Sequence, residues 1–364
     1  MMNSYEWQET LAKRHRRTRY ERIAALIFVA GILGFLLWHF FYEATPEYSL
    51  EQLRTAMASK NPNAITTYCD LDSITSHAYD DLTRDMFAQD KNLSDKTKVM
   101  FEQFYVKIKP QVVAESNKLF LSYVQYGAWQ PPEADNILKG RQLGMDYEYL
   151  IERSQLRNTQ FEKIEDVQRS GDTAHAKVKV RDMYTNTTFV LELYMENQDG
   201  TWKVMRIVNY RDYLDFLAPI QADGLKAYVA ATQDVIDKYN DILDTQQTHF
   251  KKLNETIDGI LSSKQRRQLI EYVKSDIIPA LQKRQAELDA IPLIDGGQYL
   301  SQLRHQETEI SINSWQHFIE GIANDDHAAL NTAHALHKEV DDIEYRIDDL
   351  FKNTAITGIK KTIP

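Results

Sequence analysis

The stretch AHAKVKVR, residues 174–181, decides the fold class of this chain. Ala and Val alternate strictly with His, Lys and Arg along it. A period of two is typical of a β-strand that buries one face and exposes the other. The stretch therefore predicts a sheet in a chain whose other segments have helical patterns.

Two further alternations follow at residues 189–195 and 202–208. Short polar turns bound these segments: Ser170-Gly171-Asp172, Thr185-Asn186 and Asn197-Gln198-Asp199-Gly200. Such short gaps favour an antiparallel meander of three or four strands between residues 159 and 210.

The sequence before the meander has a helical pattern from about residue 48 to 156. Leu50, Leu53 and Ala56 recur at the spacing of three and four that is typical of an amphipathic helix. A helix over 99–126 is expected to break at Pro110, because proline lacks the amide proton that a helix interior uses. Helices followed by a meander predict an α+β domain, residues 47–217, with the helices packed on one sheet face.

The sequence after the meander is helical again. Leu225, Tyr228 and Thr232 begin a heptad-like stripe, and three later segments carry similar apolar stripes. Each stripe covers one face only, so the helices need one another. The pattern predicts an antiparallel bundle of three or four helices at residues 219–355, followed by a short tail at 356–364. Whether the bundle closes within one chain or between two stays open.

The N-terminal part contains an apolar run from Ile23 to Tyr42, IAALIFVAGILGFLLWHFFY. Twenty helical residues rise about 30 Å, which is the thickness of a bilayer's hydrocarbon core. The run therefore predicts a transmembrane helix at residues 23–42. Six Lys and Arg residues lie in the tail, residues 1–22, which predicts that the tail is cytoplasmic and the rest of the chain extracytoplasmic. A cleaved signal peptide is the alternative, but its apolar region would be shorter.

The charge of the chain limits its partners. Residues 23–364 carry 37 basic and 50 acidic side chains, a net charge of about −13. This balance disfavours nucleic acid as a partner, because duplex binding needs clustered Lys and Arg. Cys69 is the single cysteine, so no disulfide can form within the chain.

Two segments carry a resemblance to known families. Tyr48-x-Leu50-x-x-Leu53-x-x-Ala56, followed by Tyr68-Cys69-Asp70-Leu71, resembles the start of a bacterial family of membrane-anchored proteins of unknown function, over about residues 47–100. The segment Gly200-Thr201-Trp202-Lys203-Val204 is similar to the last strand of NTF2-like α+β domains. These resemblances imply a single-pass protein of the bacterial cytoplasmic membrane, and they imply no activity, cofactor or catalytic residue.

The strongest metal-site candidate is a histidine group. His334 and His337 follow Asp325, Asp326 and His327, and their spacing places both rings on one helix side. Asp341 lies nearby in the sequence, so these residues together could bind a metal ion such as zinc. Leu336 and Ala333 already occupy the buried stripe, however, so we expect the two histidines to face solvent. His305 with Glu307 and Glu309 lacks the second histidine that a helical zinc-protease motif needs.

Other candidates favour structural roles. Cys69 beside Asp70 lacks a recognisable base, so we expect a buried structural residue rather than a nucleophile. A tyrosine-rich group can line a cleft or belong to the core: Tyr105, Tyr123, Tyr126, Trp129, Tyr147 and Tyr149. The sequence assigns no catalytic, cofactor-binding or metal-binding residue.

These observations favour a non-enzymatic interaction or scaffold protein that acts through residues 219–355. Its expected partner is an envelope protein or a second copy of this chain. One alternative is a ligand-binding or hydrolytic α+β domain, which a convergent set of buried polar groups with shifted pKa values would support. Another is a sensor that relays a signal to a second membrane protein.

Overall fold

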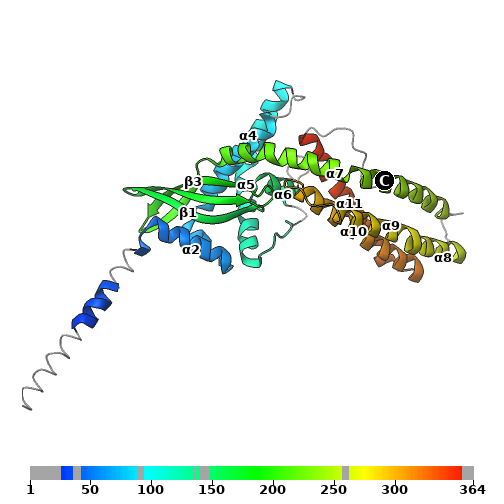
Figure 1. The fold of residues 1–364 in the computed structure, drawn as a ribbon, viewed down its shortest axis with the longest axis horizontal. Helices are drawn as coiled ribbons and strands as arrows, with labels where there is room; N and C mark the ends of the chain where they lie inside the picture. Colours follow the sequence, from blue (N-terminus) through cyan, green and yellow to red (C-terminus); the bar gives the residue numbers. More distant parts are fainter. Residues whose placement is uncertain are drawn as a thin grey trace, which may run out of the picture. The chain divides into compact units, whose positions relative to one another are not determined.

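The computed structural model describes residues 26–35, 42–88, 94–133, 136–139, 147–255 and 262–354. The chain divides into two compact units (Figure 1). The first unit comprises Met1–Tyr147, Glu162–Lys179 and Val190–Tyr210. The second comprises Glu148–Phe161, Val180–Phe189 and Arg211–Pro364. The domain limits expected from the sequence, 47–217 and 219–355, stay a prediction, and the tails 1–22 and 356–364 lie outside the described residues.

One four-stranded sheet has the strand order β1-β2-β3-β4. Its strands are β1 (Thr159–Ser170), β2 (Thr173–Asp182), β3 (Thr188–Gln198) and β4 (Thr201–Ile207). β3 pairs antiparallel with β4, and a β-bulge interrupts the register at Tyr194/Met195. Consecutive neighbours joined by short turns make a meander, the arrangement that the alternation predicts.

Four helices accompany the sheet in the first unit: α2 (Pro46–Ala58), α3 (Pro62–Tyr68), α4 (Leu71–Ala88) and α5 (Asp95–Tyr126). α2, α3 and α4 pack against β4, and α5 packs against α3 and α4. Leu50 from α2 joins Ala176, Met195 and Trp202 in one buried core. The indole Nε1 of Trp202 donates to the Ala44 carbonyl oxygen at 3.0 Å, which satisfies the polar atom of a completely buried ring.

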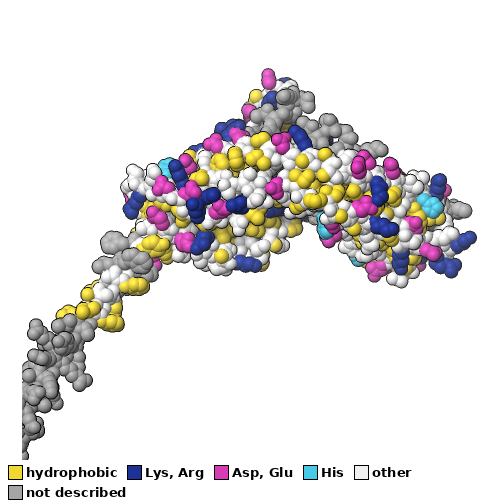
Figure 2. All heavy atoms as spheres, in the orientation of Figure 1, with side chains coloured by type: hydrophobic (Ala, Val, Ile, Leu, Met, Phe, Trp, Pro, Cys, Tyr) yellow, Lys and Arg dark blue, Asp and Glu magenta, His cyan; other side chains and the backbone are white. Residues whose placement is uncertain are grey.

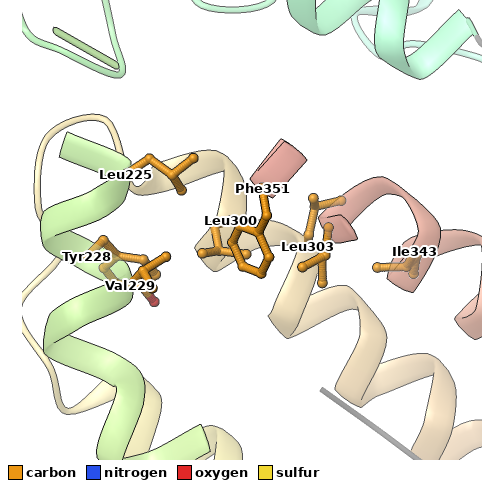
Figure 3. Packing of buried hydrophobic residues seen from close by; sticks show 8 residues of the cluster. Leu225, Tyr228, Val229, Leu300, Leu303, Ile343 and Phe351 are labelled. Atoms are coloured by element: carbon orange, nitrogen blue, oxygen red, sulfur yellow. The ribbon is translucent and has the colours of Figure 1, made fainter. Parts of the chain in front are cut away.

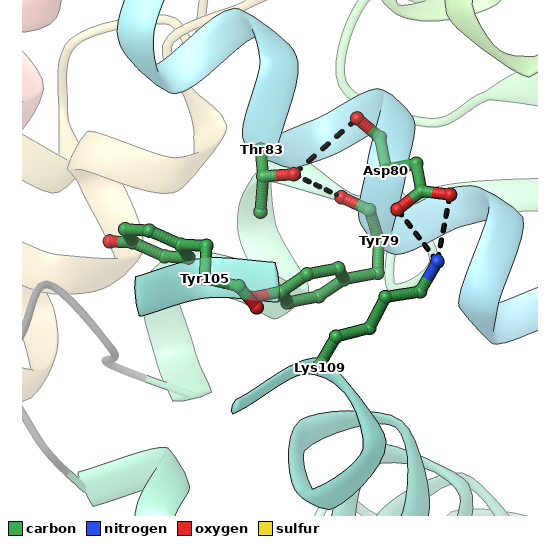
Figure 4. Close-up of polar contacts among 5 residues, drawn as sticks. All are labelled: Tyr79, Asp80, Thr83, Tyr105 and Lys109. Atoms are coloured by element: carbon green, nitrogen blue, oxygen red, sulfur yellow. Dashed lines mark hydrogen bonds and ion pairs between the residues drawn. The ribbon is translucent and has the colours of Figure 1, made fainter. Parts of the chain in front are cut away.

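Polar contacts join α4 to α5 (Figure 4). The Tyr79 hydroxyl donates to the Tyr105 carbonyl oxygen at 3.0 Å, and Lys109 Nζ lies 2.7 Å from both carboxylate oxygens of Asp80. The α5 helix continues through Pro110, so the break expected there is wrong. Pro110 is exposed, and the carbonyl that loses its helical donor can bond to water instead.

The second unit is built mainly from long helices. The long ones are α7 (Tyr210–Leu253), α10 (Gln298–Asn324) and α11 (His327–Asn353), and the shorter ones are α6 (Tyr147–Arg153), α8 (Ser263–Tyr272) and α9 (Ile278–Asp289). A π-helical turn, Val273–Ile277, joins α8 to α9. The first unit also contains a 3₁₀ turn, Ile137–Lys139.

Three helices of this unit share one apolar core (Figure 3). Leu225 and Tyr228 come from α7, Leu300 from α10, and Ile343 and Phe351 from α11, and all are buried. A second core joins α7, α9 and α10 further along the bundle. The apolar stripes of these helices are therefore buried against one another within a single chain.

The structure contradicts the predicted transmembrane helix at residues 23–42. Residues 26–35 are helical, and their apolar side chains are exposed (Figure 2). Residues 23–25 and 36–41 lie outside the described part of the chain. Among the described residues, no helix has both the length and the apolar character needed to cross a bilayer. The predictions of a single-pass anchor and of a location in a bacterial cytoplasmic membrane are therefore wrong for the described residues.

Candidate functional site

A group of polar side chains in the second unit forms the candidate site, which we call the Glu152 cluster. Its members come from α6, the segment after α6, the end of β2, the turn after β2, α10 and α11. They are Glu148, Glu152, Arg157, Asn158, Asp182, Tyr184, Tyr299 and Arg346. All eight belong to the same compact unit.

Hydrogen bonds fix the frame of the cluster. Arg157 Nη2 donates to Glu148 Oε2 at 2.9 Å, and the Tyr184 hydroxyl donates to Gln302 Oε1 on α10 at 3.2 Å. The Gly296 amide donates to the Tyr184 carbonyl oxygen at 2.7 Å. These contacts hold the turn after β2 against the start of α10.

Glu152 is the most perturbed carboxyl group of the cluster. Its side chain is half-buried as a whole, but its Oε2 atom is fully buried and has no hydrogen-bond partner. Burial raises the pKa of Glu152 to about 8, and the opposing influence of Arg157 and Asn158 is smaller. The carboxyl group therefore holds its proton at neutral pH, which is a property that binding and catalytic sites share.

Asp182 places a second carboxyl group in the same region. Its side chain has no exposed surface. Oδ2 accepts hydrogen bonds from the amide and the hydroxyl of Thr185, both at 2.7 Å, and these bonds stabilise the turn after β2. Oδ1 has no hydrogen-bond partner, and the charge of Asp182 raises the pKa of Glu152 further.

Tyr299 interacts electrostatically with groups of opposite charge. Burial raises its pKa, Glu152 raises it further, and Arg346 lowers it. Glu152 and Arg346 are therefore both within electrostatic range of one hydroxyl group. The Nε atom of Arg346 is also buried without a hydrogen-bond partner. The cluster thus offers two carboxyl oxygens and one guanidinium nitrogen whose hydrogen bonds are unmade.

A second polar group lies inside the bundle, and we call it the bundle triad: Arg284, Arg304 and Glu307. Arg284 Nη2 donates to Glu307 Oε2 at 3.0 Å, and Arg304 Nη1 donates to Thr232 Oγ1 at 2.7 Å. Burial lowers the pKa of Arg304 to about 10 and raises the pKa of Glu307. The triad joins α7, α9 and α10 between the two apolar cores.

The histidine group does not converge. His327, His334, His337 and Asp341 are all exposed, and no set of metal-ligating side chains is found among the described residues. His305 is exposed and lies near Glu309 and Asp289, at 3.2 Å and 3.9 Å. Its neighbour Glu307 instead points inward to the bundle triad.

Cys69 is half-buried by the area of the whole residue, and it forms an isolated parallel bridge with Val204 of β4. Burial, and then the charge of Asp70, raises the pKa of the thiol to about 12. A thiol with so high a pKa is a poor nucleophile.

The tyrosine-rich group also disperses. Tyr105 is buried, Tyr126 is exposed, and Tyr123 stacks on Trp129 with ring centroids 4.5 Å apart. The side chains of Tyr147 and Tyr149 lie outside the described part of the chain. Among the described rings of this group, Tyr105 is part of the buried core and Tyr126 is exposed, so these two do not face one surface.

The sequence contained signals for one member of the Glu152 cluster and for two members of the bundle triad. Asp182 continues the inward-facing positions of β2 after Ala176, Val178 and Val180, so its burial follows from the strand period. Arg304 and Glu307 occupy stripe positions of α10 between Leu300, Leu303 and Ser311. A charged residue in an apolar stripe indicates a buried polar contact, and this signal identifies Arg304 and Glu307 of the bundle triad.

No protein-family model matches the chain, and no curated protein or solved structure matches it either. The two family resemblances therefore stay predictions.

Proposed function

We propose that this protein binds a small polar ligand at the Glu152 cluster. One observation supports this above others: Glu152 Oε2, Asp182 Oδ1 and Arg346 Nε are all buried without hydrogen-bond partners. Asp182 influences the pKa of Glu152, and Glu152 and Arg346 both influence the pKa of Tyr299. A buried polar atom without a partner costs about 1–3 kcal/mol. A ligand that supplied the three missing bonds would remove that cost on binding.

The cluster has the composition of a recognition site. Carboxyl, guanidinium and phenol groups converge from elements far apart in sequence, and Glu152 has the shifted pKa that the ligand-binding alternative requires. The β-sheet and the long helices hold these groups on regular elements, which is how proteins keep binding groups in fixed positions.

The scaffold role of residues 219–355 stays a prediction. Because the apolar stripes of α7, α10 and α11 are buried in a shared core, a partner would have to bind their polar faces. Acidic and basic side chains are mixed over the face drawn in Figure 2, so that face offers little charge of a single sign to a partner.

The test uses the full chain and a panel of small amines, carboxylates, amino acids and sugars. Thermal shift finds candidate ligands, and isothermal titration calorimetry then measures their dissociation constants. Glu152→Gln keeps the shape of the side chain, and we expect it to weaken binding at least tenfold. Glu165→Gln, an exposed change on β1, is the matched control and is expected to bind like the wild type. A panel without any ligand, or equal binding by E152Q, would contradict the proposal.

A further inference from the structure

Arg304 is a positive charge inside the helical bundle, where the residue is only 2% exposed. Its Nη1 atom donates to Thr232 Oγ1 on α7 at 2.7 Å, and its Nε atom is fully buried without a hydrogen-bond partner. No carboxylate among the described residues forms an ion pair with Arg304. Within the described part of the chain, a neutral hydroxyl group is therefore the hydrogen-bond acceptor of this guanidinium group.

Glu307 does not supply the missing negative charge. It follows Arg304 by three residues on α10, but its Oε2 atom accepts from Arg284 Nη2 at 3.0 Å. The same Nη2 atom donates to Thr308 Oγ1 at 3.1 Å, which fixes Arg284 beside α10. The bundle triad thus contains two guanidinium groups and one carboxylate, and its charges sum to +1.

The surroundings of Arg304 are mainly apolar. Leu300 and Leu303 precede it on α10 and belong to the core drawn in Figure 3. The centroid of the Tyr228 ring, which belongs to the same core, lies 5.8 Å from Arg304 Cζ. A ring face attracts a cation but does not neutralise it, and a buried charge is costly unless an opposite charge accompanies it.

From these contacts we infer that a small monovalent anion of the size of chloride binds to Arg304 inside the bundle, between α7 and α10. The free Nε group would donate to the anion, while Nη1 stays bonded to Thr232. One negative charge brings the sum of the triad from +1 to zero. This site is separate from the Glu152 cluster, and the inference does not depend on the proposed ligand there.

The chemistry of the group favours a simple halide. A guanidinium group has only donors, and a halide ion has only acceptor capacity, so no hydrogen of the ligand is left without a partner. Burial lowers the pKa of Arg304 to about 10, so the group is still positive at neutral pH. Sulfate would overshoot the charge of the triad and would bring four oxygen atoms that need donors.

The first experiment measures the thermal unfolding of the full chain as gluconate is replaced by chloride at constant ionic strength. An anion that binds the folded state alone raises the melting temperature by mass action. We expect a saturating rise of about 3 °C or more up to about 200 mM chloride, and a similar rise with bromide. Gluconate is too large to enter the bundle, so it provides the background.

Chloride nuclear magnetic resonance detects the ion directly. We expect the folded protein to broaden the chloride line, and added bromide to narrow it again by competition. Protein unfolded in urea is expected to leave the line narrow, because the site exists only in the folded bundle.

Variants assign the effect to Arg304. Arg304→Met is expected to abolish the chloride-dependent rise and the line broadening. Arg267→Met, an exposed change on α8, is the matched control and should keep both. Arg304→Lys keeps the charge with a different donor geometry and is expected to reduce the rise without abolishing it. Circular dichroism shows whether each variant is folded.

The outcomes are distinct. A wild type whose melting temperature and chloride line show no halide effect overturns the inference, and so does an R304M protein that responds like the wild type. The variant E152Q is expected to keep the full chloride response, so failure at one site is separable from failure at the other.

Discussion

Arg284 and Glu307 meet inside the helical bundle, where Nη2 of the guanidinium lies 3.0 Å from Oε2 of the carboxylate and neither side chain has any exposed surface. Two charges removed from water lose their hydration, and their mutual attraction recovers only part of that loss. The pair is therefore weak evidence that the fold is highly stable. It does specify that α9 and α10 pack against each other. Arg304 adds a second positive charge from the neighbouring turn of α10.

Removing one partner of this pair is expected to be costly. Arg284→Met leaves the Glu307 carboxyl group buried without its guanidinium, and we expect the free energy of unfolding to fall by about 3–5 kcal/mol. The double variant R284M/E307L is expected to lose much less, because no buried carboxylate remains. Urea unfolding followed by circular dichroism measures both changes.

Lys238 and Glu287 provide the matched control for this experiment. Their atoms are 2.6 Å apart, but both side chains are exposed. Lys238→Met is expected to cost less than about 1 kcal/mol. A loss in R284M no larger than the loss in K238M would show that the buried pair has no special role.

The shifted pKa of Glu152 makes stability depend on pH. Its ordinary pKa is 4.5 in the unfolded chain, and folding raises it to about 8. Between these values the folded protein binds more protons than the unfolded chain, so the free energy of unfolding falls as pH rises. Above pH 8 both states are ionised, and the contribution is lost.

Glu152→Gln removes this dependence. We expect the stability of E152Q relative to the wild type to increase steadily from pH 5 to pH 8.5, as urea unfolding at each pH would show. Glu165→Gln should follow the wild type, since Glu165 is exposed. Parallel curves for E152Q and the wild type would mean that the Glu152 carboxyl group is not perturbed by folding.

Gly224 allows α7 to approach the segment before α10. A Cβ atom at this position would lie 1.9 Å from the Asp295 carbonyl oxygen, which is far inside van der Waals contact. We expect Gly224→Ala to destabilise the bundle by about 1–3 kcal/mol through displaced backbone. The neighbouring change Asp223→Ala lies at an exposed position and should leave the melting temperature almost unchanged.

Cys69 is expected to react slowly with thiol reagents. Only the thiolate attacks, and a pKa of about 12 leaves very little thiolate at pH 8. We expect a reaction with Ellman's reagent roughly 100-fold slower in the folded protein than in 8 M urea. The assay is unambiguous because the chain has one cysteine. Rapid reaction in the absence of urea would contradict the burial of this thiol.

The sheet was readable from the sequence because its packing has a short, regular period. Ala174, Ala176, Val178 and Val180 are all buried, as their alternation predicts. β1 gave no such signal, because most of its residues are exposed and its outward and inward positions are equally polar. An edge strand with little buried surface has little hydrophobic pattern to detect.

The helical stripe of α7 was predictable in part. Leu225, Tyr228, Thr232 and Tyr239 are buried as the heptad pattern predicts. Continued in alternating steps of three and four from Leu225, the heptad pattern reaches Ile242, whereas the buried residue there is Leu243. A straight helix has 3.6 residues per turn, so a stripe counted at 3.5 drifts around the helix over several turns.

The Glu152 cluster could not be assembled from the sequence. Glu152, Asp182 and Arg346 are far apart in the chain. Glu, Asp and Arg are residue types that usually lie at a protein surface, so none of the three stands out by its type. Their convergence depends on how the end of the sheet and the helices pack, which no local period encodes. Asp182 alone was accessible to sequence reasoning, through the inward face of β2.

The division into two units has a consequence for how this protein can change. The chain passes from one unit to the other at five places, after residues 147, 161, 179, 189 and 210. A gene fragment encoding residues 211–364 would leave behind 148–161 and 180–189, and with them Glu152 and Asp182. Each unit consists of three separate stretches of the chain. No single continuous gene fragment encodes either unit, so recombination of one fragment cannot transfer a whole unit to another protein.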